Sequence, residues 1–128
     1  MAKERDLELS YYDISENRYR ELKYFCRQYK EKQSRLLSIT ELSSTQFGAA
    51  RGTRISDKTA DVAMKKAHLL GELKMIEQAA LEADGELYCF ILESVTEGTP
   101  YEYLDVPMSR SGFFALRRKF FYILDQKR

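Results

Sequence analysis

The sequence predicts an all-α protein. Two long stretches, at about 14–39 and 57–83, repeat apolar residues at alternating three- and four-residue steps, which is the period of an amphipathic helix. The final stretch, 85–128, reads as a helix, a short capped helix, a tight turn and a long basic and aromatic helix. We therefore expect a long N-terminal helical hairpin or coiled-coil pair over 1–84, followed by a C-terminal three-helix helix-turn-helix unit over 85–128.

The first long helix is expected to begin near Ile14, because Asp13 and Glu16 have the spacing of a capping box. Its apolar stripe contains one polar position, Gln33. The apolar positions of this stripe are Tyr19, Leu22, Cys26, Tyr29 and Leu36. A helix with such a stripe must bury it against another element, since an isolated amphipathic helix is only marginally stable in water.

Between about 40 and 56 the helical period disappears, and small and hydroxyl residues dominate. We expect a flexible loop here, although a loop of this length is uncommon in a compact domain. Arg51 and Arg54 give the loop a basic tip. Two interpretations stay open: a flexible connector, or a basic loop that contacts a phosphate backbone or a partner.

The second long helix, 57–83, carries a similar stripe in which Lys66 is the polar interruption. Its apolar positions are Val62, Leu69, Leu73, Ile76 and Ala80. The two helices have similar lengths and faces, so they are expected to pack as a hairpin or to pair with those of another copy. We therefore expect the region 1–84 to serve in oligomerisation, with a homodimer as the favoured assembly.

Glycine and proline mark the short helix of the C-terminal unit. Gly98 is expected to end the preceding helix, as glycine does just past a helix end. Thr99 and Glu102 have capping-box spacing, and Pro100 then lies at the first helical position. Pro107 disfavours helix at the residue before it, so this helix is only about six residues long.

The last helix is expected to begin after a Ser109 cap. Its buried positions are Phe113, Leu116, Phe120 and Leu124, with Phe121 and Tyr122 partly outside the stripe. In a helix-turn-helix, residues near the start of the second helix contact base edges, and neighbouring cations contact phosphates. The candidate DNA-binding residues are Ser109, Arg110, Ser111, Phe114, Arg117, Arg118 and Lys119. Arg110 and Ser111 would meet bases, and the last three cations would meet phosphates. Phe114 either contacts a thymine methyl group or docks on a partner protein.

Charge is unevenly distributed along the chain, although the net charge is only +1. Residues 82–106 contain seven acidic residues and no basic one, whereas residues 107–128 contain six basic residues and one acidic one. Cations therefore concentrate on the proposed recognition helix, which favours DNA binding. The acidic stretch before it repels phosphates, so we expect the affinity of a monomer for DNA to be low and strongly salt-dependent.

Few residues are suited to catalysis or metal binding. Cys26 and Cys89 fall in apolar helical patterns and are expected to be reduced core residues of a cytoplasmic protein. His68 is the single histidine, so the widely spaced cysteines have no partner for a zinc site. The chain lacks a Walker loop and a dinucleotide-binding glycine pattern. We therefore expect no enzyme activity, no cofactor and no metal. No apolar run approaches the roughly 20 residues of a membrane helix, so no membrane association is expected.

Four stretches carry a resemblance to known proteins. They are Tyr24–Tyr29, Leu73–Ala80, Val95–Leu104 and Arg117–Leu124. In these stretches and in layout, the chain is similar to the ArpU/RinA-like late transcriptional regulators and related uncharacterised prophage proteins of Gram-positive bacteria. The segment 85–124 resembles the DNA-binding region four of bacterial sigma factors, in its helix lengths and in the Ser109-Arg110 start of its last helix. The resemblance implies a phage-encoded protein that binds DNA near a late promoter.

Three hypotheses for the function follow. The first is a prophage transcriptional regulator that binds double-stranded DNA at a promoter as an oligomer, with host RNA polymerase as a further expected partner. The second is a phage packaging protein, such as a small terminase subunit, which binds DNA at a packaging site. The third is a helical protein-interaction module without DNA binding. A dimer in solution favours regulation, whereas a ring of many subunits favours packaging.

Overall fold

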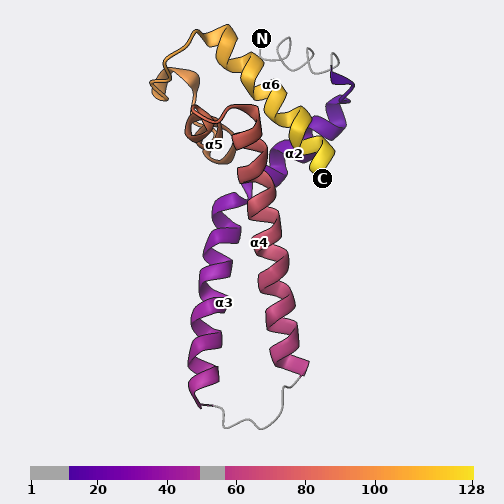
Figure 1. Cartoon of the computed structure of the whole chain (residues 1–128), viewed down its shortest axis with the longest axis vertical. Helices are drawn as coiled ribbons and strands as arrows, with labels where there is room; N and C mark the ends of the chain where they lie inside the picture. The colour runs from indigo at the N-terminus through magenta and orange to yellow at the C-terminus, as the bar shows by residue number, and fades with distance from the viewer. Residues whose placement is uncertain (1–11, 50–56) are drawn as a thin grey trace. The chain divides into compact units, whose positions relative to one another are not determined.

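The computed structural model of the chain describes residues 12–49 and 57–128, and the side chains of 12–41 and 58–128 (Figure 1). Its α-helices are α2 (Glu16–Arg27), α3 (Tyr29–Ala49), α4 (Asp57–Ala83), α5 (Tyr88–Glu97) and α6 (Arg110–Lys127), with a 3₁₀ helix, η2 (Tyr101–Tyr103). The predicted all-α class is thereby confirmed. Over the described residues, no helix combines the length and the apolar character needed to cross a membrane.

The chain divides into two compact units. Among the described residues, one unit contains 12–28 together with 75–128, and the other contains 29–49 and 57–74. The division expected from the sequence lies near residue 84, whereas the structure groups α2 with the C-terminal helices. The apolar stripe expected over 14–39 is divided between two helices. Its α2 part packs against α5 and α6, whereas its α3 part belongs to the second unit.

The first unit is built on the packing of α2, α5 and α6 (Figure 1). Its largest fully buried side chains are Phe113, Phe120, Phe121, Leu22, Ile76, Ile91, Leu124 and Cys26. Burying an aliphatic or phenylalanine side chain contributes about 1.5–3 kcal/mol relative to leaving it in water. Both cysteines are free thiols. Cys26 is buried in this core as expected, whereas the expectation of a core position is wrong for Cys89, which is exposed.

The start and end of α2 differ from the expectation. The capping box of Asp13 and Glu16 is wrong, because the cap is Ser15, whose Oγ accepts a hydrogen bond from the backbone N–H of Arg18 at 3.1 Å. The single helix expected over 14–39 is also wrong. Gln28 leaves the helical conformation, with φ −88° and ψ 2°, and α3 begins at the next residue.

In the second unit, α3 and the first part of α4 run antiparallel (Figure 1). Lys32 Nζ on α3 lies 2.9 Å from Glu72 Oε1 on α4, and both side chains are largely buried. The loop expected over 40–56 is wrong in its first part, because α3 continues to Ala49. Extending an existing helix needs no new nucleus, so serine and threonine are accommodated there despite their modest helix propensity. Arg51 and Arg54 lie outside the described residues.

The connection between α5 and α6 combines one confirmed expectation with one error. Gly98 ends α5 in the left-handed conformation, with φ 72° and ψ 22°, as expected. The capping box of Thr99 and Glu102 does not form, since Pro100 precedes a 3₁₀ helix that lacks a side-chain cap. The short helix is a single 3₁₀ turn, and the carboxylate of Glu102 accepts a hydrogen bond from Arg110.

The last helix, α6, follows the expected pattern closely. Ser109 Oγ accepts a hydrogen bond from the Gly112 N–H at 3.1 Å, which confirms the predicted cap. Among the four residues of the predicted stripe, Leu116 is only half-buried and the others are buried. Phe121, expected to lie partly outside the stripe, is 2% exposed because Tyr19 of α2 packs against its ring.

Candidate functional site

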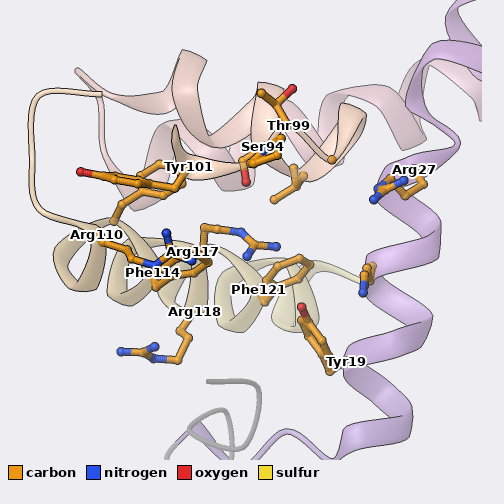
Figure 2. Close-up of a pocket in the computed structure, with 15 residues that line it drawn as sticks. Tyr19, Arg27, Ser94, Thr99, Tyr101, Arg110, Phe114, Arg117, Arg118 and Phe121 are labelled. Carbon is orange, nitrogen blue, oxygen red and sulfur yellow. The ribbon is translucent and has the colours of Figure 1, made fainter. Parts of the chain in front are cut away.

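A pocket of about 300 Å³ lies within the first unit, bounded by α2, by the connection from α5 to η2, and by α6 (Figure 2). Its basic lining residues are Lys23, Arg27, Arg110, Arg117 and Arg118. Its aromatic lining residues are Tyr19, Tyr101, Phe113, Phe114 and Phe121. Ser94 and Thr99 contribute hydroxyl groups, and within the described part of the chain no carboxylate lines it. The pocket is therefore a cationic cavity with aromatic walls.

One face of α6 supplies most of these groups. Arg110, Phe114, Arg117 and Phe121 follow one another at spacings of four, three and four residues, which places side chains on the same side of a helix. Ser109 determines where this face begins, because it caps the first turn. The positions of these side chains along the pocket wall therefore follow from the local sequence of α6.

Aromatic rings hold two of the arginines in place. The guanidinium carbon of Arg110 lies 5.2 Å from the centre of the Phe114 ring and 5.8 Å from that of Tyr101. The guanidinium carbon of Arg117 lies 5.5 Å from the Phe114 ring and 5.6 Å from the Phe121 ring. Each contact is a cation–π attraction of about 0.5–1 kcal/mol at an exposed site. The stacks limit the rotamers of both side chains.

Other contacts fix the rings themselves. The Tyr101 hydroxyl donates a hydrogen bond to the Met108 carbonyl at 2.5 Å, which ties η2 to the residue before the α6 cap. The Phe121 ring meets the Tyr19 ring edge-on, with centroids 5.1 Å apart, and the Phe120 ring with centroids 5.0 Å apart. Such edge-to-face pairs are favourable beyond simple burial. The aromatic wall is consequently part of the folded core.

Two cations of the pocket come from α2. Lys23 Nζ lies 5.8 Å from the centre of the Tyr19 ring. The Arg27 guanidinium lies directly beside Gly98, and a β-carbon built on that glycine would be 2.7 Å from Arg27 Cζ. This position is the carboxyl end of α5, where the helix dipole attracts a cation. Figure 2 shows Arg27 extending from α2 towards this connection.

The cations differ in how they are compensated. Arg110 Nη1 donates to Glu102 Oε2 at 2.5 Å. The pKa of Glu102 is lowered, first by a hydrogen bond from its own backbone N–H and then by that from Arg110. Arg117 is the opposite case, since its Nε is buried and finds no acceptor among the described residues. A buried donor without an acceptor costs about 1–3 kcal/mol.

The structure brings together four of the candidate residues from the sequence, namely Arg110, Phe114, Arg117 and Arg118. The other three are placed differently. Ser109 is a helix cap, and Ser111 and Lys119 are exposed and do not line the pocket. Lys119 lies close enough to Asp84 for its charge to help lower the pKa of that carboxyl, after the hydrogen bonds from the Leu87 and Glu86 N–H groups.

Sequence reasoning missed the α2 side of the pocket. Tyr19, Lys23 and Arg27 are four residues apart and so share one edge of α2. The sequence contains this spacing, but cations beside an apolar stripe usually mark only the solvent-exposed edge of an amphipathic helix. Nothing in the local sequence indicates that this edge meets α6, which begins more than 80 residues later.

No protein-family model matches this chain, and it is matched by no curated protein and no solved structure. Over the described residues, no group of three or more His, Cys, Asp or Glu side chains is placed to hold a metal ion. The chemistry that the pocket does offer is the binding of negative charge.

Proposed function

We propose that this protein binds duplex DNA, with the cations around the pocket contacting the phosphate backbone. The observation that carries the proposal is the convergence of five basic side chains from α2 and α6 on one cavity whose lining, among the described residues, lacks a carboxylate. Neutralising phosphates with Lys and Arg supplies most of the affinity of nonspecific DNA binding. Arginine also forms bidentate hydrogen bonds with phosphate.

The proposed reader is a helix-turn-helix-like arrangement of α5, η2 and α6. The first turn of α6 contains no acidic residue, so its N-terminus favours a nearby phosphate. Exposed Ser111 and Lys119 would extend the contact beyond the pocket. The connection between α5 and α6 is longer than the three- or four-residue turn of a standard helix-turn-helix. For Arg110 to read a base, its guanidinium must release the Glu102 carboxylate and form a hydrogen bond with the base edge instead.

The narrower form of the proposal is a prophage transcriptional regulator that acts at a late promoter, with host RNA polymerase as a partner. It rests on the resemblance of the sequence to ArpU/RinA-like regulators and to region four of sigma factors. Its site residues are the α6 candidates already named, with α2 adding Lys23 and Arg27.

Fluorescence anisotropy with a labelled duplex from the DNA flanking the protein's own gene tests the proposal. Arg110→Ala combined with Arg118→Ala is expected to weaken binding by about tenfold and to reduce the salt slope by about 0.9 for each phosphate that is no longer neutralised. Lys58→Ala combined with Lys74→Ala is the matched control, because it removes the same charge from exposed positions of α4. Absence of binding at low salt, or equal weakening in both pairs, would overturn the proposal.

A second candidate function, self-association or protein interaction, is favoured by apolar side chains in the second unit. Leu37, Met64 and Leu70 are 60%, 69% and 43% exposed. A helical pair of this kind gains stability when another copy covers such side chains. We propose a homodimer, and the variant Leu37→Glu combined with Met64→Glu is expected to be monomeric in light scattering. A ring of many subunits would favour packaging instead, and a monomeric wild-type chain would exclude the dimer.

A further inference from the structure

We propose that the pocket between α2, α5 and α6 is a binding site for one phosphomonoester dianion (Figure 2). The ligand is either a small phosphorylated molecule, such as a nucleoside monophosphate, or the 5′-phosphate at the end of a DNA strand. The inference goes beyond contact with the phosphodiester backbone. It stands or falls separately from duplex binding, because an end-group or a free phosphate needs no double helix.

The first argument is uncompensated charge. Arg110 is paired with Glu102. Lys23, Arg27 and Arg117, by contrast, form no ion pair with any carboxylate in the described part of the chain. Like charges gathered around one cavity repel one another, and the repulsion is stronger where the walls are apolar. A dianion relieves this repulsion more than the single negative charge of a phosphodiester does.

The second argument is preorganisation. The Arg117 guanidinium lies beside the Phe114 and Phe121 rings, and its buried Nε has no hydrogen-bond acceptor among the described residues. Its planar fork of N–H donors is thus oriented by packing instead of by a carboxylate, and phosphate oxygens match that fork. Because the rings have already restricted the side chain, binding loses less conformational entropy. Figure 2 shows Arg117 extending along the space between α5 and α6.

The third argument is size and neutral donors. The volume of about 300 Å³ is at the small end of ligand pockets, which suits a phosphate with a small organic group. Ser94 and Thr99 add hydroxyl groups to the lining, and a hydroxyl can donate to a phosphate oxygen. A phosphomonoester carries about −1.5 to −2 charge at neutral pH and three strong acceptor oxygens. Its chemistry therefore complements this lining.

The test must separate ligand binding from folding. Arg27 has a structural explanation, since it lies beside Gly98 at the end of α5, and so it is unsuited as a probe. Lys23 is half-buried and contacts the Tyr19 ring, so Lys23→Gln should leave the fold intact. Arg117→Gln removes the stacked guanidinium, and Arg117→Lys keeps the charge but not the fork. Lys58→Gln, on the exposed face of α4, is the matched control.

Titration calorimetry with inorganic phosphate and with a nucleoside 5′-monophosphate gives the primary measurement. We expect saturable binding with one site per chain, and a melting temperature that rises with phosphate concentration. Lys23→Gln and Arg117→Gln are each expected to weaken binding by at least about tenfold, Arg117→Lys by less, and Lys58→Gln not at all. No saturable binding by the folded wild-type chain, or wild-type affinity in Lys23→Gln and Arg117→Gln, overturns the inference.

Two duplexes of identical sequence, one with 5′-phosphate and one with 5′-hydroxyl ends, distinguish the sources of the phosphate. Tighter binding of the phosphorylated duplex that depends on Lys23 assigns the pocket to a strand end. Equal binding of both, together with saturable binding of the monophosphate, assigns it to a small molecule. Duplex binding that needs Arg110 and Arg118, without any binding of phosphate or monophosphate, supports the proposed function and overturns the phosphate site. Phosphate binding without duplex binding supports the phosphate site and overturns the proposed function.

Discussion

The carboxylate of Glu102, on η2, accepts a hydrogen bond from Nη1 of Arg110, the first residue of α6, with an N···O distance of 2.5 Å. A hydrogen bond from its own backbone N–H and the one from Arg110 lower the pKa of Glu102, and this carboxyl is ionised at neutral pH. The residue that the sequence places closest to the base edges is therefore engaged by an acid on the neighbouring turn. DNA must compete with that acid for Arg110, which provides a direct way to test whether this side chain meets DNA.

Glu102→Gln is expected to raise the affinity for duplex DNA by roughly two- to threefold and to steepen its salt dependence, because Arg110 is released and a repelling charge is removed. Anisotropy titrations of wild type and variant at two salt concentrations provide the measurement. Glu93→Gln is the control, since it neutralises an exposed acid of α5 that lines no part of the pocket. Equal gains in both variants would mean that only net charge matters and that Arg110 has no contact with DNA.

The helical class, the Gly98 stop and the Ser109 cap were predictable because each depends on a period or a local hydrogen bond. The helical register of the residues after Gln28 was not predictable. The expected stripe places Gln33 next to Leu36, yet the structure buries Lys32 and exposes Gln33. A break of one residue between α2 and α3 shifts every later position, and no glycine or proline marks it.

Half of the pocket was predictable for the same reason. Arg110, Phe114 and Arg117 share a face of α6, so their proximity follows from helical spacing alone. Lys23 and Arg27 depend on how α2 packs against α5 and α6, which is a tertiary contact between distant parts of the chain. The period of the first stretch indicates that it buries a face, but it does not indicate which partner covers it.

Gly98→Ala and Gly71→Ala are expected to change stability in opposite directions. Gly98 has φ 72°, and its β-carbon would collide with the Arg27 guanidinium, so alanine should lower the free energy of unfolding by about 1–2 kcal/mol. Gly71 lies inside α4, and nothing lies within 4 Å of a β-carbon built there, so alanine should raise it by about 0.5–1 kcal/mol. Urea denaturation of the two variants measures both effects. A neutral Gly98→Ala would contradict the close approach of Arg27.

Arg18 and Asp125 connect α2 to α6 through a hydrogen bond of 2.6 Å from Arg18 Nε to Asp125 Oδ1. The two side chains are 30% and 23% exposed, so solvent screens the pair only in part. A double-mutant cycle with alanine is expected to give a coupling energy of about 1 kcal/mol. The surface-exposed pair of Arg20 and Glu16 is the control, and its coupling should be at most about 0.5 kcal/mol. Equal couplings would show that the contact between α2 and α6 contributes nothing beyond a surface pair.

Asp84 gives the fold a defined dependence on pH. Its carboxylate accepts hydrogen bonds from the Leu87 and Glu86 N–H groups at 2.9 and 2.8 Å, and these lower its pKa in the folded state. A pKa lower in the folded than in the unfolded chain stabilises the fold above the ordinary pKa of aspartate, and that stabilisation disappears as pH falls through the lowered value. Asp84→Asn removes this titration, so the difference in stability between wild type and variant should shrink steadily over that acidic range.

Urea midpoints of wild type and Asp84→Asn, measured from neutral pH downwards, give the comparison. Asp61→Asn is the control, because it makes the same substitution at an exposed carboxyl of α4. Wild type and Asp61→Asn should therefore lose stability in parallel, while Asp84→Asn starts lower and converges on them in acid. A constant difference between wild type and Asp84→Asn at every pH would mean that the amide replaces the carboxylate as an acceptor and that its charge has no part in starting α5.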